Sequence, residues 1–386
     1  MQYIKLKDVF TIQKGKKIEQ ISEYQKNSIR CIQIEDLRHN DMLKYCLPNE
    51  KNVVAEEEDI LIAWDGANAG TVGTGLVGAV GSTLAKMTLK TDKLLAPFVA
   101  ILLQSKFDYF QQTATGATIP HISRKALEDI DLPVIDIEIQ KKIVKVINSS
   151  LDLIKKRQFQ IAALDELKKS VFLEMFGDPV TNTKKFSYSK LGSVIDVIGG
   201  YAFKSKDFVA EGIPVIKIGT VNKGYFDSKT LAFLPAEFTD KYNKFFVYPK
   251  DLLITLTGTV GKDDYGNICE IPDEYSRYLL NQRVAKLEIR TNLSKEYLKY
   301  CFKNKKYKNQ LTKLSRGVRQ ANISNDDIKS LDIPIPPLEL QQEFEKFIIR
   351  VNKQEVLLKE SLELLHDQYE SLLSKVFKGE LFQEQT

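Results

Sequence analysis

A long uninterrupted stretch in the middle of the chain limits the fold more than any other feature. Residues Glu138–Phe176 contain neither proline nor glycine, and their apolar side chains recur at steps of three and four. This spacing predicts a single helix. At about 1.5 Å per residue the helix would be roughly 55–60 Å long. A compact domain does not need such a length internally, so we expect another element to pack along it.

The apolar positions of this stretch follow the 4-3 spacing of a coiled-coil heptad, with polar interruptions at Ser150, Arg157 and Lys168. A second stretch, Glu339–Phe377, has the same spacing and one interruption, Glu355. The predicted seam positions are Ile143, Ile147, Ile154, Ile161, Leu164 and Val171 in the first helix and Ile348, Val351, Leu358, Leu362, Leu365 and Leu372 in the second. Either direction of pairing is sterically possible. We favour an antiparallel pair, in which Glu355 on one helix can balance Arg157 and Lys168 on the other.

The second half of the chain repeats the landmarks of the first half in the same order. The segments that begin at Leu6, Ile29, Asp59 and Gly81 correspond to those that begin at Leu191, Ile213, Asp251 and Asn281. Gly116 lies 201 positions before Gly317, and the same offset holds through the two long helical stretches. Each half is therefore expected to be a strand-rich domain followed by one long helix, with Pro133 or Pro334 near the junction.

These patterns predict an α+β protein with an internal twofold repeat. Its two similar strand-rich domains would be separated by a pair of long, antiparallel coiled-coil helices. The expected boundaries are a first domain over residues 1–137, a central helix over 138–177, a second domain over 178–336, and a C-terminal helix and tail over 337–386.

Composition argues against several other classes of protein. The chain has 386 residues, 43% of them hydrophobic, which is enough for about two or three domains. No run approaches the roughly 18 apolar residues of a membrane span, and charged side chains interrupt the N-terminal segment MQYIKLKDVF. We therefore expect a cytoplasmic protein without a membrane partner. The four cysteines form no CxxC pair, which favours buried free thiols over a zinc site or disulfides.

The charge distribution is compatible with a nucleic-acid partner. The net charge is only +5, but the segment Lys295–Arg319 contains nine basic residues and a single acid, Glu296. A solvated helix face is the simpler explanation of such a run. The density of the run, and its end in SRGVRQ, favour contact with phosphates.

The sequence gives little support for catalysis. Gly73, Gly75 and Gly78 match GxGxxG, but the residues that follow alternate like a strand rather than forming a helix. We therefore expect a glycine-rich hairpin here instead of a dinucleotide site. The three histidines of the chain are far apart, and no glycine motif for S-adenosylmethionine is present. We expect no catalytic residue, metal site or cofactor site in this chain.

The order of these landmarks, present twice, resembles the DNA-specificity subunit of Type I restriction-modification systems. The likeness spans essentially the whole chain. It rests on the LP and IPIPPLELQ segments before the long helices, on FLEMFGDP at the end of the first helix, on the two DLLI-like segments with their turns, and on the TG-x-x-x-x-x-IS segment with its counterpart at Gly317. The resemblance implies two target-recognition domains, each for one half of a split double-stranded DNA target. It also implies that the two helices set the spacer and bind methyltransferase (M) subunits, two in number.

Catalysis and S-adenosylmethionine binding would then belong to the modification subunit. ATP and Mg would belong to a restriction (R) subunit. Two alternatives remain open: the recognition subunit of a Type IIB-like system, and a coiled-coil scaffold whose domains bind proteins rather than DNA. Binding to duplex DNA that weakens with salt would separate the scaffold from the other two.

Candidate DNA contacts follow from residue chemistry in equivalent loops. They are Lys14, Lys16 and Lys17 around Gly15, then Tyr201, Lys204, Ser205 and Lys206 after Gly200, and finally Arg316, Arg319 and Gln320 around Gly317. Lysine suits phosphate contact, whereas arginine and glutamine can recognise guanine and adenine edges. The matching first-half loop, Thr115–His121, lacks arginine until Arg124, so a shared mechanism at this loop is not expected.

Two further groups suit either base recognition or internal hydrogen bonding. They are Asn281, Gln282 and Arg283 in the second half and Trp64, Asp65 and Asn68 in the first half. We favour the internal role for both groups.

Overall fold

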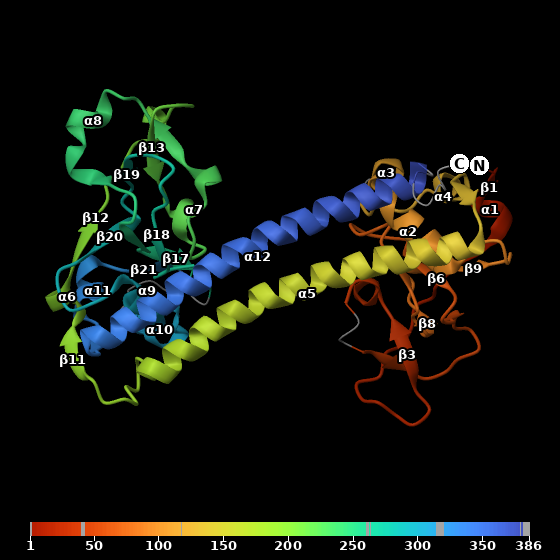
Figure 1. Cartoon of the computed structure of the whole chain (residues 1–386), viewed down its shortest axis with the longest axis horizontal. Helices are drawn as coiled ribbons and strands as arrows, with labels where there is room; N and C mark the ends of the chain where they lie inside the picture. The colour runs from red at the N-terminus through yellow and green to blue at the C-terminus, as the bar shows by residue number, and fades with distance from the viewer. Residues whose placement is uncertain are drawn as a thin grey trace. The chain divides into compact units, whose positions relative to one another are not determined.

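The computed structural model describes residues 2–39, 43–116, 118–259, 262, 264–313, 320–378 and 380 (Figure 1). The chain divides into two compact units, which are described separately. Unit 1 consists of Met1–Gln158 and Glu360–Thr386, and unit 2 consists of Phe159–Lys359. None of the helices in the described part of the chain is both long and apolar enough to cross a membrane.

Two long helices, α5 (Ile137–Phe176) and α12 (Leu338–Lys378), each contribute one half to each unit. In unit 1, Ile143 near the start of α5 shares a hydrophobic core with Val376 near the end of α12. In unit 2, Phe172 near the end of α5 packs against Phe344 near the start of α12, with ring centroids 5.6 Å apart. The helices therefore run antiparallel within each unit, as predicted.

The predicted seam positions are all buried or half-buried. Ile143, Ile147 and Ile154 are buried on α5, as are Ile348 and Val351 on α12. The remaining positions are half-buried: Ile161, Leu164, Val171, Leu358, Leu362, Leu365 and Leu372. Their neighbours along the helices are mostly exposed, so a narrow stripe on each helix carries the packing.

Unit 1 contains two four-stranded sheets. The first is antiparallel, in the order β2 (Phe10–Lys14), β9 (Leu84–Leu89), β6 (Ile60–Ala63), β7 (Val72–Thr74). The second has the order β4 (Tyr45–Cys46), β3 (Ile29–Ile32), β8 (Gly78–Val80), β5 (Val54–Ala55), with β3 and β8 parallel. A short pair, β1 (Gln2–Lys5) and β10 (Asp131–Val134), lies next to the entry into α5.

The helical elements of unit 1 outside the long pair are short. They are α1 (Leu6–Val9), the 3-10 turn η1 (Ile34–Leu37), α2 (Ala96–Ser105), α3 (Phe107–Thr113) and α4 (Arg124–Glu128). Most side chains of helix α2 are buried, and they form one core with the β2-β9-β6-β7 sheet and the start of α5. This core ties the sheet to the long helix pair inside the unit.

Unit 2 has the same strand orders and one additional short strand pair. Its antiparallel sheet has the order β12 (Ile195–Gly199), β20 (Val284–Ile289), β16 (Leu252–Thr255), β18 (Ile268–Glu270). Its second sheet has the order β14 (Ala232–Leu234), β13 (Ile213–Ile216), β19 (Tyr278–Leu280), β15 (Phe246–Val247), with β13 and β19 parallel. The short pairs are β11 (Ser187–Lys190) with β22 (Asp332–Ile335) and β17 (Thr257–Thr259) with β21 (Gln320–Asn322).

The helices of unit 2 are also short apart from the long pair. They are α6 (Leu191–Val194), α7 (Ile218–Val221), α8 (Phe238–Lys241), α9 (Lys295–Lys303), α10 (Lys305–Lys313) and α11 (Asn325–Ser330). Matching strand orders in the two units confirm the internal repeat predicted from the sequence.

The repeat extends to individual buried side chains. Gln140 at the start of α5 is fully buried, and its Oε1 accepts a 2.8 Å hydrogen bond from the backbone N of Leu95. Gln341 at the start of α12 is equally buried, and its Oε1 accepts a 2.8 Å bond from the backbone N of Ser294. Each Nε2 donates to two backbone carbonyls. The same device therefore locks each long helix to its own domain.

The prediction of a glycine-rich hairpin around Gly75 is wrong. Strand β7 pairs with β6, whereas β8 pairs with β3 and β5 in the other sheet. Gly75 and Gly78 have φ angles of +70° and +147°, which let the chain cross from one sheet to the next. The alternating pattern correctly predicts strands in this segment, but it does not indicate which strands they pair with.

All four cysteines are free and buried, as expected. Burial raises the pKa of the Cys269 thiol to about 12, so this group stays protonated at neutral pH.

Candidate nucleic-acid interface

The sheet topology of unit 1 gathers several loops at one edge. Strand β9 is antiparallel to both β2 and β6, so the ends of β2 and β6 meet the start of β9. Gly15, just after β2, donates its backbone N–H to Leu84 O at 2.9 Å. Trp64, just after β6, donates to Thr83 O at 2.7 Å. The predicted contact loop around Gly15 therefore lies beside residues 64–66 and 81–83.

A fourth segment closes this group of loops. Thr115 and His121 exchange backbone hydrogen bonds of 2.9 and 2.8 Å. The segment is also bound to the turn after β6, because Gly66 N donates to Pro120 O at 2.8 Å and Ile122 N donates to Trp64 O at 2.9 Å. We call residues 14–17, 64–66, 81–83, 115–116 and 118–122 the recognition loops of unit 1.

An ionic group lies at the centre of these loops. The two carboxylate oxygens of Asp65 have separate partners: Oδ2 lies 2.9 Å from Lys14 Nζ, and Oδ1 lies 2.6 Å from His121 Nδ1. The Asp65 side chain is 17% exposed, against 50% for Lys14 and 45% for His121. Lys14, a predicted DNA contact, thus forms an ion pair while half of its side chain stays exposed. Lys16 and Lys17 are exposed.

Unit 2 builds the same group of loops from equivalent segments. Gly200 N donates to Val284 O at 3.2 Å, and Tyr201 N donates to Leu280 O at 2.8 Å. Leu256, just after β16, is bonded on both sides: its N–H donates to Arg283 O at 2.9 Å, and its carbonyl accepts from Ile323 N at 2.8 Å. We call residues 200–206, 256–259, 281–283 and 320–323 the recognition loops of unit 2.

The structure places the predicted contacts of unit 2 in two ways. The ring of Tyr201, 38% exposed, packs against Phe203, Tyr242 and Phe245 with centroid distances of 5.2, 4.8 and 5.1 Å. It therefore anchors the loop to a small aromatic cluster. The side chains that follow, Lys204, Ser205 and Lys206, are exposed.

The third predicted group is only partly described. Arg316 and Arg319 lie outside the described residues. Gln320 begins strand β21, where its backbone is opposite Thr259 of β17. This pairing places Gln320–Asn322 in the recognition loops of unit 2.

The residues that suit either base recognition or an internal role have different surroundings in the two units. In unit 1, Asp65 is bound by Lys14 and His121, and Asn68 accepts a hydrogen bond from Arg38, so both act internally. In unit 2, Gln282 and Arg283 are exposed, and the internal role that we favoured for them has no support. Their exposure adds an arginine to the recognition loops of unit 2.

The basic run Lys295–Arg319 is less available than its charge indicates. Lys299 forms ion pairs with Glu296 at 2.6 Å and Glu270 at 3.7 Å. Lys308 is 4% exposed, and its Nζ donates to Asn267 Oδ1 at 2.7 Å. These two lysines therefore hold α9 and α10 against the rest of unit 2.

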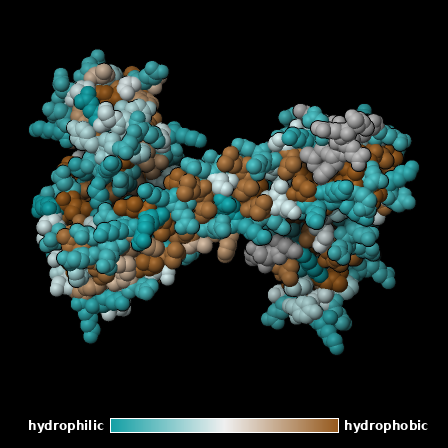
Figure 2. Space-filling model, in the orientation of Figure 1, coloured by the Kyte–Doolittle hydropathy of each residue, from teal (hydrophilic) through white to brown (hydrophobic). Residues whose placement is uncertain are grey.

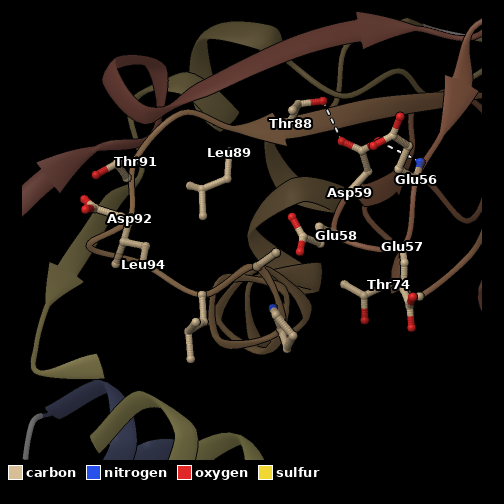
Figure 3. A pocket seen from close by; sticks show the side chains of 14 residues that line it. Glu56, Glu57, Glu58, Asp59, Thr74, Thr88, Leu89, Thr91, Asp92 and Leu94 are labelled. Carbon is tan, nitrogen blue, oxygen red and sulfur yellow. Dashed lines mark hydrogen bonds between the residues drawn. The ribbon is translucent and has the colours of Figure 1, made fainter. Parts of the chain in front are cut away.

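The opposite edge of the unit 1 sheet is acidic. A cavity of about 680 Å³ lies there, between the start of β6 and the start of α2 (Figure 3). Its lining includes Glu56, Glu57, Glu58, Asp59 and Asp92. Asp59 is held by Thr88 Oγ1 at 2.5 Å and by Lys86 Nζ at 3.4 Å. Such an edge repels phosphates, whereas the edge with Lys16 and Lys17 attracts them.

Apolar side chains reach the surface of the long helices. In unit 2, Ile349, Val356 and Leu357 of α12 are 51%, 53% and 64% exposed and line a shallow groove of about 530 Å³. Figure 2 shows brown apolar areas over the helical part of a mostly hydrophilic surface. Exposed apolar side chains gathered around a groove in this way are typical of a protein-binding surface.

The chain matches specificity subunits of Type I restriction enzymes over most of their length. The chain is 28% identical to the Type I restriction enzyme MjaVIII specificity subunit of Methanocaldococcus jannaschii, over 88% of this chain and 83% of the relative. It is 21% identical to the EcoBI specificity subunit of Escherichia coli, over 92% of this chain and 81% of the relative.

Solved structures share the fold. A chain from a type I restriction-modification system superimposes with a TM-score of 0.60 and 17% identity, covering 98% of both chains. The specificity subunit of a Type I system from M. genitalium superimposes with a TM-score of 0.59 and 16% identity, covering 100% of this chain and 96% of that one. Both likenesses include the strand-rich units and the long helices.

A family model described as the Type I restriction modification DNA specificity domain matches residues 1–163 and again residues 183–365. The two matches follow the repeat seen in the strand orders and in the paired glutamines. This chain therefore belongs to the family of Type I restriction-modification DNA specificity subunits and carries two copies of its domain.

Proposed function

We propose that this chain is a non-catalytic specificity subunit whose two domains each recognise one half of a bipartite double-stranded DNA target. One observation carries the proposal. Both units build the same set of loops at the same edge of equivalent sheets, through the same backbone hydrogen bonds. Two such surfaces in one chain suit a target with two separate halves.

The chemistry of the loops suits DNA. Exposed lysines, Lys16 and Lys17 in unit 1 and Lys204 and Lys206 in unit 2, are available for phosphates. The exposed Gln282 and Arg283 add an amide and a guanidinium that can recognise adenine and guanine edges. The loops differ in side chains while their backbones correspond, so the two domains would recognise different half-sites.

The long helices would set the distance between the half-sites. Helices α5 and α12 contain 40 and 41 residues. Recognition through successive major-groove faces places contacts about one helical turn, 34–36 Å, apart. Inserting one heptad into each helix keeps the seam in register and should lengthen the unread spacer without changing the bases of either half-site. An unchanged spacer would contradict this role.

The exposed apolar side chains of Ile349, Val356 and Leu357 would contribute to binding methyltransferase (M) subunits, two per chain in the full assembly with restriction (R) subunits. S-adenosylmethionine would be held by the M subunit, and ATP and Mg by the R subunit. This chain would supply specificity alone and act in the cytoplasm.

The decisive experiment is methylome sequencing of cells that carry the chain with its M subunit and of cells that lack only the chain. A bipartite methylated motif should appear with the chain and disappear without it. The purified complex should bind a duplex with this motif, and binding should weaken steeply with salt. A motif that persists without the chain, or binding that ignores DNA sequence, would overturn the proposal.

A further inference from the structure

We propose that His121 is a specificity-determining residue of the first domain, and that it contacts a base edge of the first half-site through its Nε2. This inference rests on the proposed function and deepens it. It assigns a recognition role to a residue for which the sequence alone indicates none. Its support is the Asp65–His121 pair and the equivalent pair in unit 2.

The two units place different side chains at the same cross-strand position. In unit 1, Asp65 and His121 are paired directly across from each other in an antiparallel bridge. In unit 2, Thr257 and Asn322 are paired in the same way between β17 and β21. Each pair follows the end of the equivalent strand, β6 or β16. The position therefore lies within the recognition loops of both units and differs in chemistry between them.

The carboxylate of Asp65 determines which ring nitrogen of His121 is left for a ligand. A carboxylate only accepts hydrogen bonds, so His121 Nδ1, 2.6 Å from Asp65 Oδ1, must carry a proton. The other oxygen, Oδ2, is bound by Lys14. In the neutral ring Nε2 is then an acceptor, and in the charged ring it is a donor. Either form can meet a base edge in the major groove.

The imidazole is held in place before any ligand binds. Its backbone is clamped by both hydrogen bonds to Thr115, and Asp65 fixes the ring from one side. Gly116 has a φ of +101°, and a Cβ at this position would lie 3.0 Å from His121 Cδ2 and 2.4 Å from Ile119 O. The backbone of the loop therefore approaches the ring closely. A side chain that is already ordered loses little entropy on binding, which favours recognition.

Exposure and charge also suit contact with DNA. The His121 side chain is 45% exposed, whereas Asp65, which would repel phosphates, is 17% exposed and covered by its two partners. Lys14 beside it supplies a positive charge that is 50% exposed. The group thus presents a lysine and an imidazole outward and keeps the carboxylate beneath them.

Three variants at one position separate recognition from a structural role. The probe is the complex of this chain with its M subunit, bound to duplexes with the methylome-defined motif in which each base pair is replaced in turn. His121→Asn retains an amide near the Nδ1 position for Asp65 but lacks Nε2. His121→Gln extends an amide toward the Nε2 position, and His121→Phe removes both nitrogens. Circular dichroism and thermal unfolding would check that each variant is folded.

The expected result is a loss of discrimination at one base pair of the first half-site. His121→Phe and His121→Asn should both reduce the preference for the correct base about tenfold, with His121→Gln retaining part of it. Preferences throughout the second half-site should not change. Asp65→Asn should give a smaller loss at the same base pair, because the ring is then less firmly oriented.

Several results would overturn the inference. One is unchanged discrimination at every base pair in His121→Phe, and another is full rescue by His121→Asn, which would make the Asp65 bond purely structural. Equal weakening on all duplexes would show a phosphate contact or a folding defect instead. If the unmodified complex itself shows no sequence preference, it is the proposed function that fails.

Discussion

The Nζ of Lys168 on α5 lies 2.6 Å from Oε2 of Glu355 on α12, and this contact joins polar positions of the two seams within unit 2. Lys168 is only 5% exposed. Asp165 at 3.1 Å from Lys168 and Lys359 at 2.6 Å from Glu355 extend the pair into a short network. A buried charge of this kind specifies register, because sliding the helices would leave it without a partner.

Replacing one member of this ion pair should lower the stability of the protein more than replacing both. Glu355→Ala should lower the free energy of unfolding by about 2 kcal/mol, because a buried ammonium loses its main partner, whereas the double variant with Lys168→Met should recover much of this loss. Chemical denaturation of the four variants in a double-mutant cycle measures the coupling. Lys169→Ala, which breaks the exposed pair with Glu166, should have an effect near zero.

The same pair predicts a pH dependence. Burial alone would raise the pKa of Glu355, but hydrogen bonds from Lys168 and Lys359 leave it below its usual value. The pair's contribution is therefore fully present above the unfolded pKa of about 4.3 and is lost as the pH falls through the lower folded pKa. Unfolding curves between pH 7 and pH 3 should show less acid destabilisation in the double variant. Equal acid sensitivity in both proteins would contradict the assignment.

The two buried glutamines at the starts of α5 and α12 should contribute equally to the stability of the protein. Gln140→Leu leaves the backbone N of Leu95 and two carbonyls without partners, and Gln341→Leu does the same around Ser294. Each should lower the free energy of unfolding by about 2 kcal/mol, because buried polar groups lose their hydrogen bonds. Gln342→Ala, at the exposed neighbouring position, should change stability little. Different costs for the two substitutions would show that the repeat is not energetically equivalent.

Two glycines should be essential for the placement of the recognition loops. A Cβ on Gly15 would lie 2.2 Å from Gly81 O, and one on Gly200 would lie 2.4 Å from Asn281 O. Alanine at either position must push the loop away from its neighbouring strand, so binding to a duplex with the methylome-defined motif should weaken at least tenfold. Gly219→Ala meets no atom within 4 Å and serves as the matched control. Normal binding by the Gly15 variant would show that the loop position is unimportant.

The exposed lysines of unit 1 should contribute to binding without regard to sequence. Lys16→Gln and Lys17→Gln should each reduce the slope of log K against log salt by about 0.9, the value for one phosphate contact. The loss should be similar on matched and mismatched duplexes. Lys51→Gln, also exposed but outside the recognition loops, should leave the slope unchanged. A sequence-dependent loss at Lys16 would assign it to base recognition instead.

Much of the architecture was accessible from local sequence patterns. A stretch without proline or glycine and with a heptad of apolar residues allows only one regular structure, so the bounds of α5 and α12 agree with prediction to within a residue or two. The order of landmarks in the two halves also anticipated equivalent sheets. Charge at the polar seam positions favours the antiparallel pairing, and the contact between Lys168 and Glu355 agrees with it within unit 2.

The recognition loops were anticipated only in part. The loops after Gly15 and Gly200 were identified by their lysines and by their equivalence in the repeat. Their spatial neighbours are not evident from the sequence, and neither is the ion pair between Lys14 and Asp65. The exposure of Arg283, for which we favour an internal role from the sequence, is not predictable because a single sequence does not show which polar side chain of a turn faces solvent.

The sequence by itself determined the elements that depend on local periodicity: the two long helices, their seams and the twofold repeat. Only the tertiary structure decided which loops meet, because strand partners and register are set by packing between segments far apart in the chain. His121 and Asp65 are separated by 56 positions, and their contact exists only because the segment after Thr115 closes onto the turn after β6. No local pattern contains that distance, yet it defines the proposed specificity of the first domain.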